Sequence, residues 1–405
     1  MTLPDAPADE AGLATAIAAA AGAREPLSVS GNGSKAPMLR PVQAARSLST
    51  RNLTGITLYS PAELVLAARA GTPLSLIEET LAEHGQQMIA EPPDLHALLG
   101  TTAEPTLGGT VGANLSGPRR IKGGATRDHV LGMRAVNGEG VVIRSGGRVL
   151  KNVTGLDLCK LIAGSHGTLA VMTEITLKVL PQPERTGTVA VTGVDAATGV
   201  AALAAALGSP YAVSGAAFLP AEAASLALSD GPAAGSGTAF VRIEEFAPSV
   251  AYRTERLASE LGKFGRIELL DDAGSRTLWR NVRDVLPLAA DLGENHAVWR
   301  LSVPPSLGPR VAETAAALGG RWFLDWGGGL VWVVATAESA HHQAITKAAD
   351  AAGGVWMLLR APDSLRASLD ALPPLSPPLA RLTRRVKAAF DPAGILNPGR
   401  MYAGI

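Results

Sequence analysis

Two glycine-rich stretches lie far apart in this 405-residue chain and decide how its fold is interpreted. They are Ser30-Gly31-Asn32-Gly33-Ser34-Lys35 and Thr106-Leu107-Gly108-Gly109-Thr110-Val111-Gly112-Ala113-Asn114-Leu115-Ser116-Gly117-Pro118-Arg119-Arg120. Main-chain N–H groups can approach a diphosphate closely only where glycine and other small residues keep side chains out of the way. One such stretch is common in proteins, but two of them predict a binding site for a diphosphate-containing cofactor.

The first stretch matches neither of two widespread nucleotide-binding motifs. A Walker loop requires Gly-x-x-x-x-Gly-Lys followed by Ser or Thr, and a Rossmann loop requires Gly-x-Gly-x-x-Gly. By themselves, residues 30–35 would be interpreted as a turn. The second stretch changes that interpretation, because residues 106–120 show neither helical nor strand periodicity and end in paired arginines.

Composition excludes several classes of function. The 36 basic and 36 acidic side chains cancel, so no long-range field attracts nucleic acid or an anionic membrane surface. Cys159 is the single cysteine, which excludes an internal disulfide and a thiolate metal cluster and fits a reducing cytoplasm. No export signal is expected at the acidic start of the chain, and the uncharged residues 196–221 are too poor in Leu, Ile and Phe to span a membrane.

The first part of the chain alternates short helices and strands. Ser60-Pro61-Ala62-Glu63 predicts a helix beginning at Pro61, and Thr72-Pro73 predicts a second helix that ends at Gly85. Strands are expected at residues 27–29, 56–59, 140–144 and 169–179. Two prolines in residues 181–184 indicate a boundary, so we expect a first domain at residues 1–183.

After this boundary, the sequence predicts the order strand, helix, strand, strand, helix, strand, and predicts it twice. This order is a ferredoxin-like split βαβ unit. The first unit is expected at residues 188–192, 196–207, 213–219, 238–243, 249–261 and 266–270. The second is expected at residues 298–303, 307–318, 322–325, 330–335, 340–352 and 355–359. Together they predict an α+β cap domain at residues 184–375 with one antiparallel sheet. A Pro-rich linker at residues 361–378 leads to a helix at residues 378–390, and residues 376–405 are expected to return to the first domain.

The order of several segments resembles that of the FAD-linked oxidases of the vanillyl-alcohol oxidase, or PCMH, type. Besides the first glycine loop, the matching segments are residues 59–64 (YSPAEL), 70–74 (AGTPL), 107–111 (LGGTV), 116–120 (SGPRR), 151–155 (KNVTG), 163–169 (AGSHGTL), 299–304 (WRLSVP) and 390–400 (FDPAGILNPGR). The resemblance therefore implies a PCMH-type FAD-binding domain followed by the cap.

The resemblance also implies which residues bind FAD. The diphosphate would be bound by main-chain amides of Ser30, Gly31, Asn32, Gly33 and Ser34. The remaining contacts would come from Gly109, Thr110, Gly112, Ala113 and Asn114 around the diphosphate and ribityl chain, Ser116 and Gly117 beside the isoalloxazine, Val171 at the adenine, and Arg119 or Arg120 as a positive charge. Relatives with covalent flavin use a His in the first loop, and this loop has none, so non-covalent FAD is expected.

Within this family, the sequence resembles the FAD-binding subunits of bacterial glycolate oxidase. This resemblance implies oxidation of glycolate or a related 2-hydroxy acid to the 2-oxo acid, with a second FAD-linked oxidase subunit and an iron–sulfur subunit as partners. Relatives that act alone carry a His-rich metal motif that is absent here, so no metal is expected and the partner flavoprotein would hold the main substrate site. The expected location is cytoplasmic, or at the inner membrane through those partners.

One charged residue lies in an apolar strand of the expected cap. Arg300 would either anchor a substrate carboxylate bidentately or form an internal salt bridge, for instance with Asp325, and the sequence does not choose between them. Trp279, Trp326 and Trp332 are expected in the core. Two other functions stay open: a stand-alone FAD oxidase or dehydrogenase for another small alcohol or acid, and an electron-transfer or scaffold subunit without a substrate.

Overall fold

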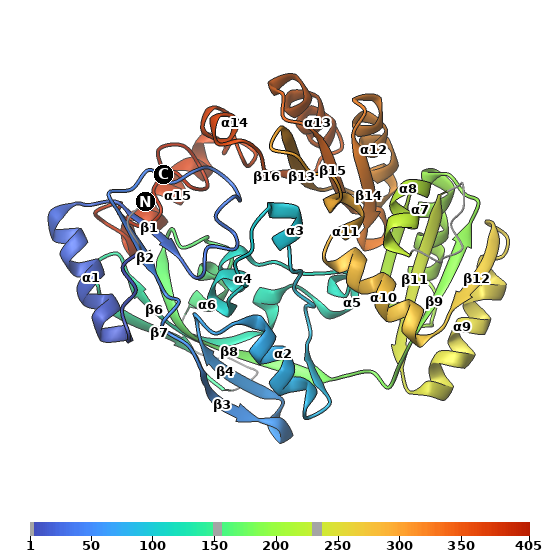
Figure 1. Cartoon of the computed structure of the whole chain (residues 1–405), viewed down its shortest axis with the longest axis horizontal. Helices are drawn as coiled ribbons and strands as arrows, with labels where there is room; N and C mark the ends of the chain where they lie inside the picture. Colours follow the sequence, from blue (N-terminus) through green and yellow to red (C-terminus); the bar gives the residue numbers. More distant parts are fainter. Residues whose placement is uncertain (1–3, 149–155, 229–236) are drawn as a thin grey trace.

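The computed structural model describes residues 4–148, 156–228 and 237–405. The segment 151–155, which carries part of the resemblance, lies outside the described residues. Figure 1 shows two lobes, each built on its own β-sheet, with both ends of the chain on the same lobe. We call the lobe with the chain ends the N-terminal lobe and the other the cap.

The N-terminal lobe contains a six-stranded antiparallel sheet in the order β3-β4-β8-β6-β7, with β5 paired to β8. Its strands are β3 (Ile56–Ser60), β4 (Val65–Arg69), β5 (Gln86–Met88), β6 (Val130–Asn137), β7 (Val142–Gly146) and β8 (Ala170–Pro181). The long strand β8 pairs with β4, β5 and β6. Its alternating apolar positions are buried in the core of this lobe, as the sequence predicts.

The helix expected from Pro61 does not form. Pro61–Glu63 makes a single turn of 3-10 helix (η1) without a side-chain cap from Ser60, and β4 begins at Val65. Residues 65–68 are all buried between β3 and β8, and this tertiary pairing overrides the local capping signal. The next expected helix is confirmed as α2 (Leu74–Ala82), which buries Leu74, Ile77 and Leu81.

The glycine-rich stretch at residues 106–120 contains helix, although its sequence has no helical period. The helices are α4 (Leu107–Ala113) and α5 (Arg120–Gly123). This lobe also contains the longer helix α1 (Glu10–Ala23) and the short helices α3 (His96–Leu99), α6 (Leu158–Ile162) and η2 (Thr126–His129).

The end of the chain packs against its beginning. The helix α15 (Pro377–Phe390) precedes a tail in which Leu396 bridges to Leu27 of β1 (Leu27–Ser30), a strand that pairs in parallel with β2 (Arg46–Ser49). The side chain of Asn397 accepts from the Val29 amide at 2.7 Å and donates to the carbonyl groups of Val29 and His166. The tail therefore helps to hold the first glycine loop, which follows β1.

The cap contains an eight-stranded antiparallel sheet in the order β12-β9-β11-β10-β14-β15-β13-β16. Its first half comprises β9 (Arg185–Thr192), α7 (Ala196–Leu207), β10 (Gly215–Leu219), β11 (Thr238–Glu245), α9 (Ala247–Leu261) and β12 (Arg266–Leu270). The second half comprises β13 (His296–Ser302), α12 (Gly308–Ala317), β14 (Arg321–Asp325), β15 (Leu330–Thr336), α13 (Ser339–Ala351) and β16 (Val355–Arg360). These are the two predicted split βαβ units, joined where Phe218 pairs with Leu324.

Several cap elements were not predicted. They are α8 (Ala221–Ala227), α10 (Asp272–Arg283), α11 (Leu286–Ala289), η3 (Pro305–Leu307), η4 (Trp326–Gly328) and α14 (Asp363–Ser368). The last lies within the expected linker, where buried Arg366 donates to the carbonyl group of Leu39 at 2.8 Å. None of the helices in the described ranges is both long and apolar enough to cross a membrane.

The two faces of the cap sheet have different neighbours. Trp299 of β13 donates from its indole N–H to His342 of α13 at 3.2 Å, so its face of the sheet packs on the helices. Arg300 is the next residue, and its side chain points to the opposite face because side chains alternate along a strand. That opposite face lies toward the N-terminal lobe in Figure 1.

Candidate functional site

Both glycine-rich stretches line one cavity, which is open to solvent and has a volume of about 180 Å³. The first stretch contributes all six of its residues, and α4 contributes Gly108, Gly109, Gly112 and Ala113. Strand β8 adds Ala170, Val171 and Met172 to the wall. The fold therefore brings together two segments that are more than 70 residues apart in the sequence.

The first glycine loop offers unpaired main-chain donors. Within the described part of the chain, the amides of Asn32, Gly33 and Ser34 donate no hydrogen bond to another residue. Gly33 has φ +85°, in the left-handed region that glycine adopts without strain. Consecutive free amides that face a cavity form a nest for an anion.

The first amides of helix α4 are not free to donate to a ligand, but its glycines allow a ligand to approach the main chain closely. Its amides at Gly108, Gly109 and Thr110 are already bonded to the Ala70 carbonyl and to Thr106, whose side chain caps the helix. A Cβ at position 109 would lie 3.2 Å from the Thr106 hydroxyl and 3.9 Å from the Lys35 ammonium. The glycines thus keep this wall flat so that a ligand can lie against it.

Two cations that the sequence analysis did not nominate line the same cavity. Lys35 has Ser34 Oγ at 3.4 Å as its only polar side-chain partner among the described residues, and burial lowers its pKa to about 8. Arg400 donates to the Lys35 carbonyl at 2.8 Å, and burial lowers its pKa to about 10. Two desolvated cations beside free amides fit a diphosphate, which would compensate both charges.

Neither cation was recognisable as part of a cluster in the sequence. Lys35 is the last residue of the first loop, so its position beside the glycines could have identified it as a candidate cation. Arg400 lies near the other end of the sequence, and no local pattern connects it with the loop. His166 also lines the cavity. Burial lowers its pKa to about 3, and its backbone has φ +51°.

Five of the expected cofactor residues do not line this cavity. Thr110 buries its hydroxyl without a hydrogen-bond partner among the described residues. Asn114 ends α4 and accepts from the Arg127 amide, while the Ser116 hydroxyl accepts from the Thr126 amide. The fourth and fifth, Gly117 and Arg119, lie at the contact with the cap.

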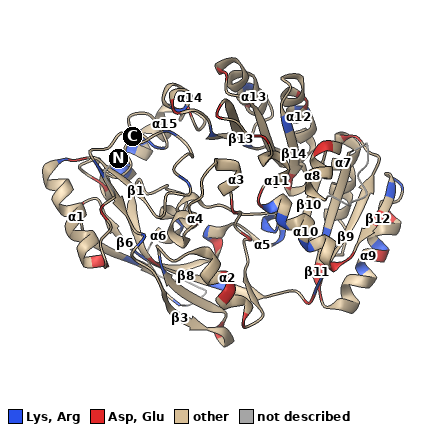
Figure 2. Cartoon of the chain, viewed as in Figure 1, with Lys and Arg blue, Asp and Glu red and all other residues tan. Residues whose placement is uncertain are grey.

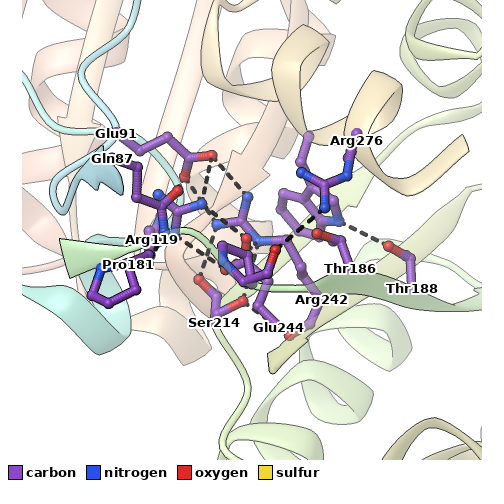
Figure 3. A network of polar contacts seen from close by, with 12 residues as sticks. Gln87, Glu91, Arg119, Pro181, Thr186, Thr188, Ser214, Arg242, Glu244 and Arg276 are labelled. Carbon is purple, nitrogen blue, oxygen red and sulfur yellow. Dashed lines mark hydrogen bonds and ion pairs between the residues drawn. The ribbon is translucent and has the colours of Figure 1, made fainter. Parts of the chain in front are cut away.

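Arg119 belongs to a buried network of four charges between the two lobes, drawn in Figure 3. It donates to both carboxylate oxygens of Glu244 on β11, at 2.8 and 3.1 Å, and lies 3.6 Å from Glu91. Arg242, also on β11, donates twice to Glu91. The two arginines hold the pKa of the Glu91 and Glu244 carboxyl groups below their usual range. The charge of Arg119 is therefore compensated by carboxylates of the protein itself.

A second group of charged residues surrounds Trp326, where the cap meets residues 117–120. The guanidinium carbons of Arg120 and Arg300 lie 4.6 and 4.9 Å from the centre of a Trp326 ring, and that of Arg300 lies 5.8 Å from a Trp332 ring. The indole N–H of Trp326 donates to the Gly117 carbonyl at 3.1 Å. Figure 2 shows α5, which begins with Arg120, as a basic segment between the lobes.

The alternative internal salt bridge of Arg300 is not observed. Within the described residues, neither Arg300 nor Arg120 makes an ion pair or a side-chain hydrogen bond. Among the described residues, Asp325 accepts a hydrogen bond only from the Trp326 amide, at 2.7 Å, and burial raises its pKa to about 7. Trp279 and Trp332 are buried as predicted. Trp326 was also expected in the core, but it is only partly buried and lies at the contact with the other lobe.

No three His, Cys, Asp or Glu side chains gather into a possible metal site within residues 4–148, 156–228 and 237–405. The cavity lined by both glycine-rich stretches has the chemistry of a cofactor site. Its free amides, two buried cations and glycine walls suit a diphosphate.

Comparison with known proteins agrees with this geometry. A family described as the FAD binding domain matches residues 5–146, and the C-terminal domain of FAD linked oxidases matches residues 375–401. The glycolate oxidase subunit GlcE of Escherichia coli is 35% identical over 94% of this chain and 93% of its own length. A D-lactate dehydrogenase of Archaeoglobus fulgidus is 34% identical over 35% of this chain and 30% of its own. The structure of p-cresol methylhydroxylase superposes with a TM-score of 0.76 at 13% identity, over 98% of this chain and 87% of that one.

Proposed function

Because the chain belongs to the family of FAD-linked oxidases that includes GlcE, we propose that it is the FAD-binding subunit of a glycolate oxidase complex. In that complex, glycolate or a related 2-hydroxy acid is oxidised to the 2-oxo acid, and the electrons pass to partner subunits. The observation that carries the proposal is the cavity lined by both glycine stretches together with Lys35 and Arg400.

FAD is the cofactor, and when bound it supplies the two-electron acceptor for the hydride that leaves the substrate carbon. Amides of residues 30–34 bind its diphosphate, and Lys35 and Arg400 neutralise the charge. The walls at Gly109, Gly112 and Ala113 contact the diphosphate and ribityl chain, and Val171 contacts the adenine. No residue of the first loop can form a covalent flavin link through His, so the FAD is non-covalent.

The remaining residues of the second stretch act near the isoalloxazine. Ser116 and Gly117 approach it, while Thr110 and Asn114 shape α4 and the turn that leads to them. Arg119 acts indirectly, because its ion pairs hold that turn against the cap. Arg300 anchors the substrate carboxylate, and its freedom from ion pairs in the described structure supports this role.

We assign the work to three parts of the chain: residues 1–183 bind FAD, residues 184–375 form the cap for substrate or partner, and residues 376–405 close the FAD domain. A second FAD-linked oxidase subunit is the natural partner, since a glycolate oxidase subunit GlcD of Bacillus subtilis is 46% identical over 79 residues. A chain with one cysteine cannot hold an iron–sulfur cluster, so a quinone-linked complex needs a separate iron–sulfur subunit.

The proposal is tested with the FAD-replete chain, a dye acceptor and glycolate. We expect little turnover by the chain alone and recovery of activity when the second flavoprotein and the iron–sulfur subunit are added. Turnover by the isolated chain equal to that of the complex would instead establish a stand-alone oxidase. A complex that is equally active without this chain's FAD would establish a scaffold.

A further inference from the structure

Helix α15 presents an exposed basic face. Residues 371–390 contain four basic side chains and no acidic one, although the charges of the whole chain cancel. Three of the four are exposed, namely Arg381, Arg384 and Arg385. Among the described residues, the only ion pair of α15 is that of the fourth, Lys387, with Asp391 at 2.7 Å. The three arginines therefore carry charge that the described protein does not compensate.

Two leucines extend this face. Leu379 and Leu382 are 53% and 56% exposed, and they lie one helical turn apart. Leu382 is likewise one turn before Arg385, so leucine and arginine side chains are neighbours along the outside of the helix. Each Å² of apolar surface removed from water contributes about 25 cal/mol, so covering the two leucines would be favourable.

Lys387 fixes which side of α15 faces the protein. Its ammonium donates to the carbonyl groups of Thr168 and Leu396 at 2.6 and 2.8 Å, and it is the one buried residue of the helix. At about 100° per residue, Arg385 lies about 200° from Lys387 around the helix axis, and Leu382 lies about 140° from it. Both side chains therefore point away from the lobe, and Figure 1 shows α15 at the edge of that lobe, beside the chain ends.

The neutral net charge of the chain does not cancel this face at close range. At physiological ionic strength the Debye length is about 8 Å, so a surface that touches α15 experiences mainly the charges of that helix. Asp391, the first acid after the helix, is buried and paired with Lys387. The complementary surface is therefore an anionic one.

The size of the face favours a lipid surface over a protein partner. A helix of 14 residues is about 21 Å long, and its outward side, about 10 Å wide, covers roughly 200 Å². A stable protein interface needs about 800 Å² on each partner. On the side of Arg384 the surface does not continue flat, because a cavity of about 620 Å³ lies between α15 and Arg40. A bilayer surface needs no complementary shape, and basic helices with exposed leucines lie in its headgroup region.

We propose that α15 attaches this chain directly to the surface of an anionic lipid bilayer. The guanidinium groups of Arg381, Arg384 and Arg385 pair with lipid phosphates, while Leu379 and Leu382 enter the headgroup region. This goes beyond the proposed function, because the attachment needs neither a partner subunit nor the oxidation of a substrate.

The test is co-sedimentation of the FAD-replete full chain with lipid vesicles. One set contains equal parts of phosphatidylglycerol and phosphatidylcholine, and the other contains phosphatidylcholine alone. We expect binding to the anionic set only, and weaker binding as salt is raised, because exposed charges are screened. The double variant Arg381→Gln, Arg385→Gln should lower the partition coefficient roughly thirtyfold, since each arginine near an anionic surface is worth about a factor of five.

Further variants separate charge from apolar insertion. Arg381→Lys with Arg385→Lys keeps both charges and should bind within about twofold of wild type. Leu379→Ala with Leu382→Ala should bind roughly tenfold more weakly, because less apolar surface enters the headgroup region. The matched control is Arg310→Gln with Lys347→Gln, which removes the same charge from exposed positions of α12 and α13 in the cap. It should change the partition coefficient by less than about twofold.

Flavin content and melting temperature are recorded for every variant and should match wild type, because the replaced side chains are exposed. Equal binding to both vesicle sets, no binding to either, or wild-type binding by the double Arg→Gln variant would overturn the proposal. If neither vesicle set binds and the double Arg→Gln variant fails to assemble with the second flavoprotein, the face belongs to a protein partner instead. Vesicle binding needs no turnover, so its result is independent of whether the assembled complex oxidises glycolate.

Discussion

Arg242 of the cap donates to both carboxylate oxygens of Glu91 in the N-terminal lobe, at 2.8 and 2.9 Å. The pair is almost completely shielded from solvent and is completed by Arg119 and Glu244. Arg242 also lies over the buried Trp279, whose indole N–H bonds to Thr188. This contact holds the cap sheet at a defined position over the turn that carries Gly117 and Arg120.

Removing the arginine of this pair should destabilise the protein strongly. Arg242→Met leaves Glu91 and Glu244 buried with one cation between them, and breaking a buried pair costs about 3–5 kcal/mol. The free energy of unfolding in urea measures the effect. Arg46→Met, which removes an exposed arginine paired with Asp5 and Glu25, is the control and should cost less than about 1 kcal/mol. Equal losses in the two variants would contradict this assignment.

Asp325 should make stability depend on pH. Its folded pKa of about 7 lies above the ordinary value of 3.8, so the folded state keeps a proton that the unfolded chain has lost. The free energy of unfolding therefore falls as pH rises from 3.8 to 7 and is then constant. Asn does not titrate, so the free energy of unfolding of Asp325→Asn should not show this fall. From pH 5 to pH 8 the difference between variant and wild type should therefore change in favour of the variant by roughly 3 kcal/mol, at about 1.4 kcal/mol per pKa unit.

The control for this measurement is Asp195→Asn, which replaces another aspartate that caps a helix. The pKa of Asp195 is lowered, chiefly by hydrogen bonds from Thr198, so this group does not titrate between pH 5 and pH 8. Its substitution should have the same effect at both pH values. A pH-independent effect of Asp325→Asn would show that Asp325 is ionised throughout.

Lys35 should make FAD binding depend on pH. Binding of the diphosphate favours the charged lysine, whose pKa without ligand is about 8. Above that pH, binding must take up a proton, so the dissociation constant should rise by about tenfold per pH unit. Fluorescence titration of the FAD-free chain from pH 7 to pH 9, below the pKa of about 10 of Arg400, measures this. Lys35→Met should bind FAD more weakly at pH 7 and show a flat profile, and a slope that survives the substitution would assign the titration to another group.

Gly109→Val should abolish FAD binding while the cap stays folded. The branched side chain would enter the space between Thr106 and Lys35, where the main chain of α4 borders the cavity. Flavin content after reconstitution and the near-ultraviolet circular dichroism of the cap tryptophans are the two readouts. Gly147→Ala, at a glycine with open space around it, is the control. Stoichiometric FAD in the Val variant would mean that the cofactor does not lie against α4.

Local patterns explain which parts of the fold were predictable. In the cap, the apolar run along β11 and the helical spacing along α9 are properties of consecutive residues, and both split βαβ units follow from them. The signals failed where a neighbour in space decides the conformation. Pro61 begins a single helical turn because β4 is taken into the sheet, and α4 forms in a glycine-rich stretch because its first amides bond to Ala70 and Thr106.

The sequence by itself determined two features of the site: the two glycine-rich stretches and the apolar strand interrupted by Arg300. Chain flexibility, hydrophobic period and residue type depend only on residues that are neighbours in the sequence. Only the tertiary structure decided which charges serve the site. Arg119, near the end of the second stretch, is neutralised by Glu244 of the cap, whereas Arg400 from the end of the chain joins Lys35 at the cavity. Whether a buried charge is compensated depends on its neighbours in space, and those neighbours lie up to hundreds of residues away along the chain.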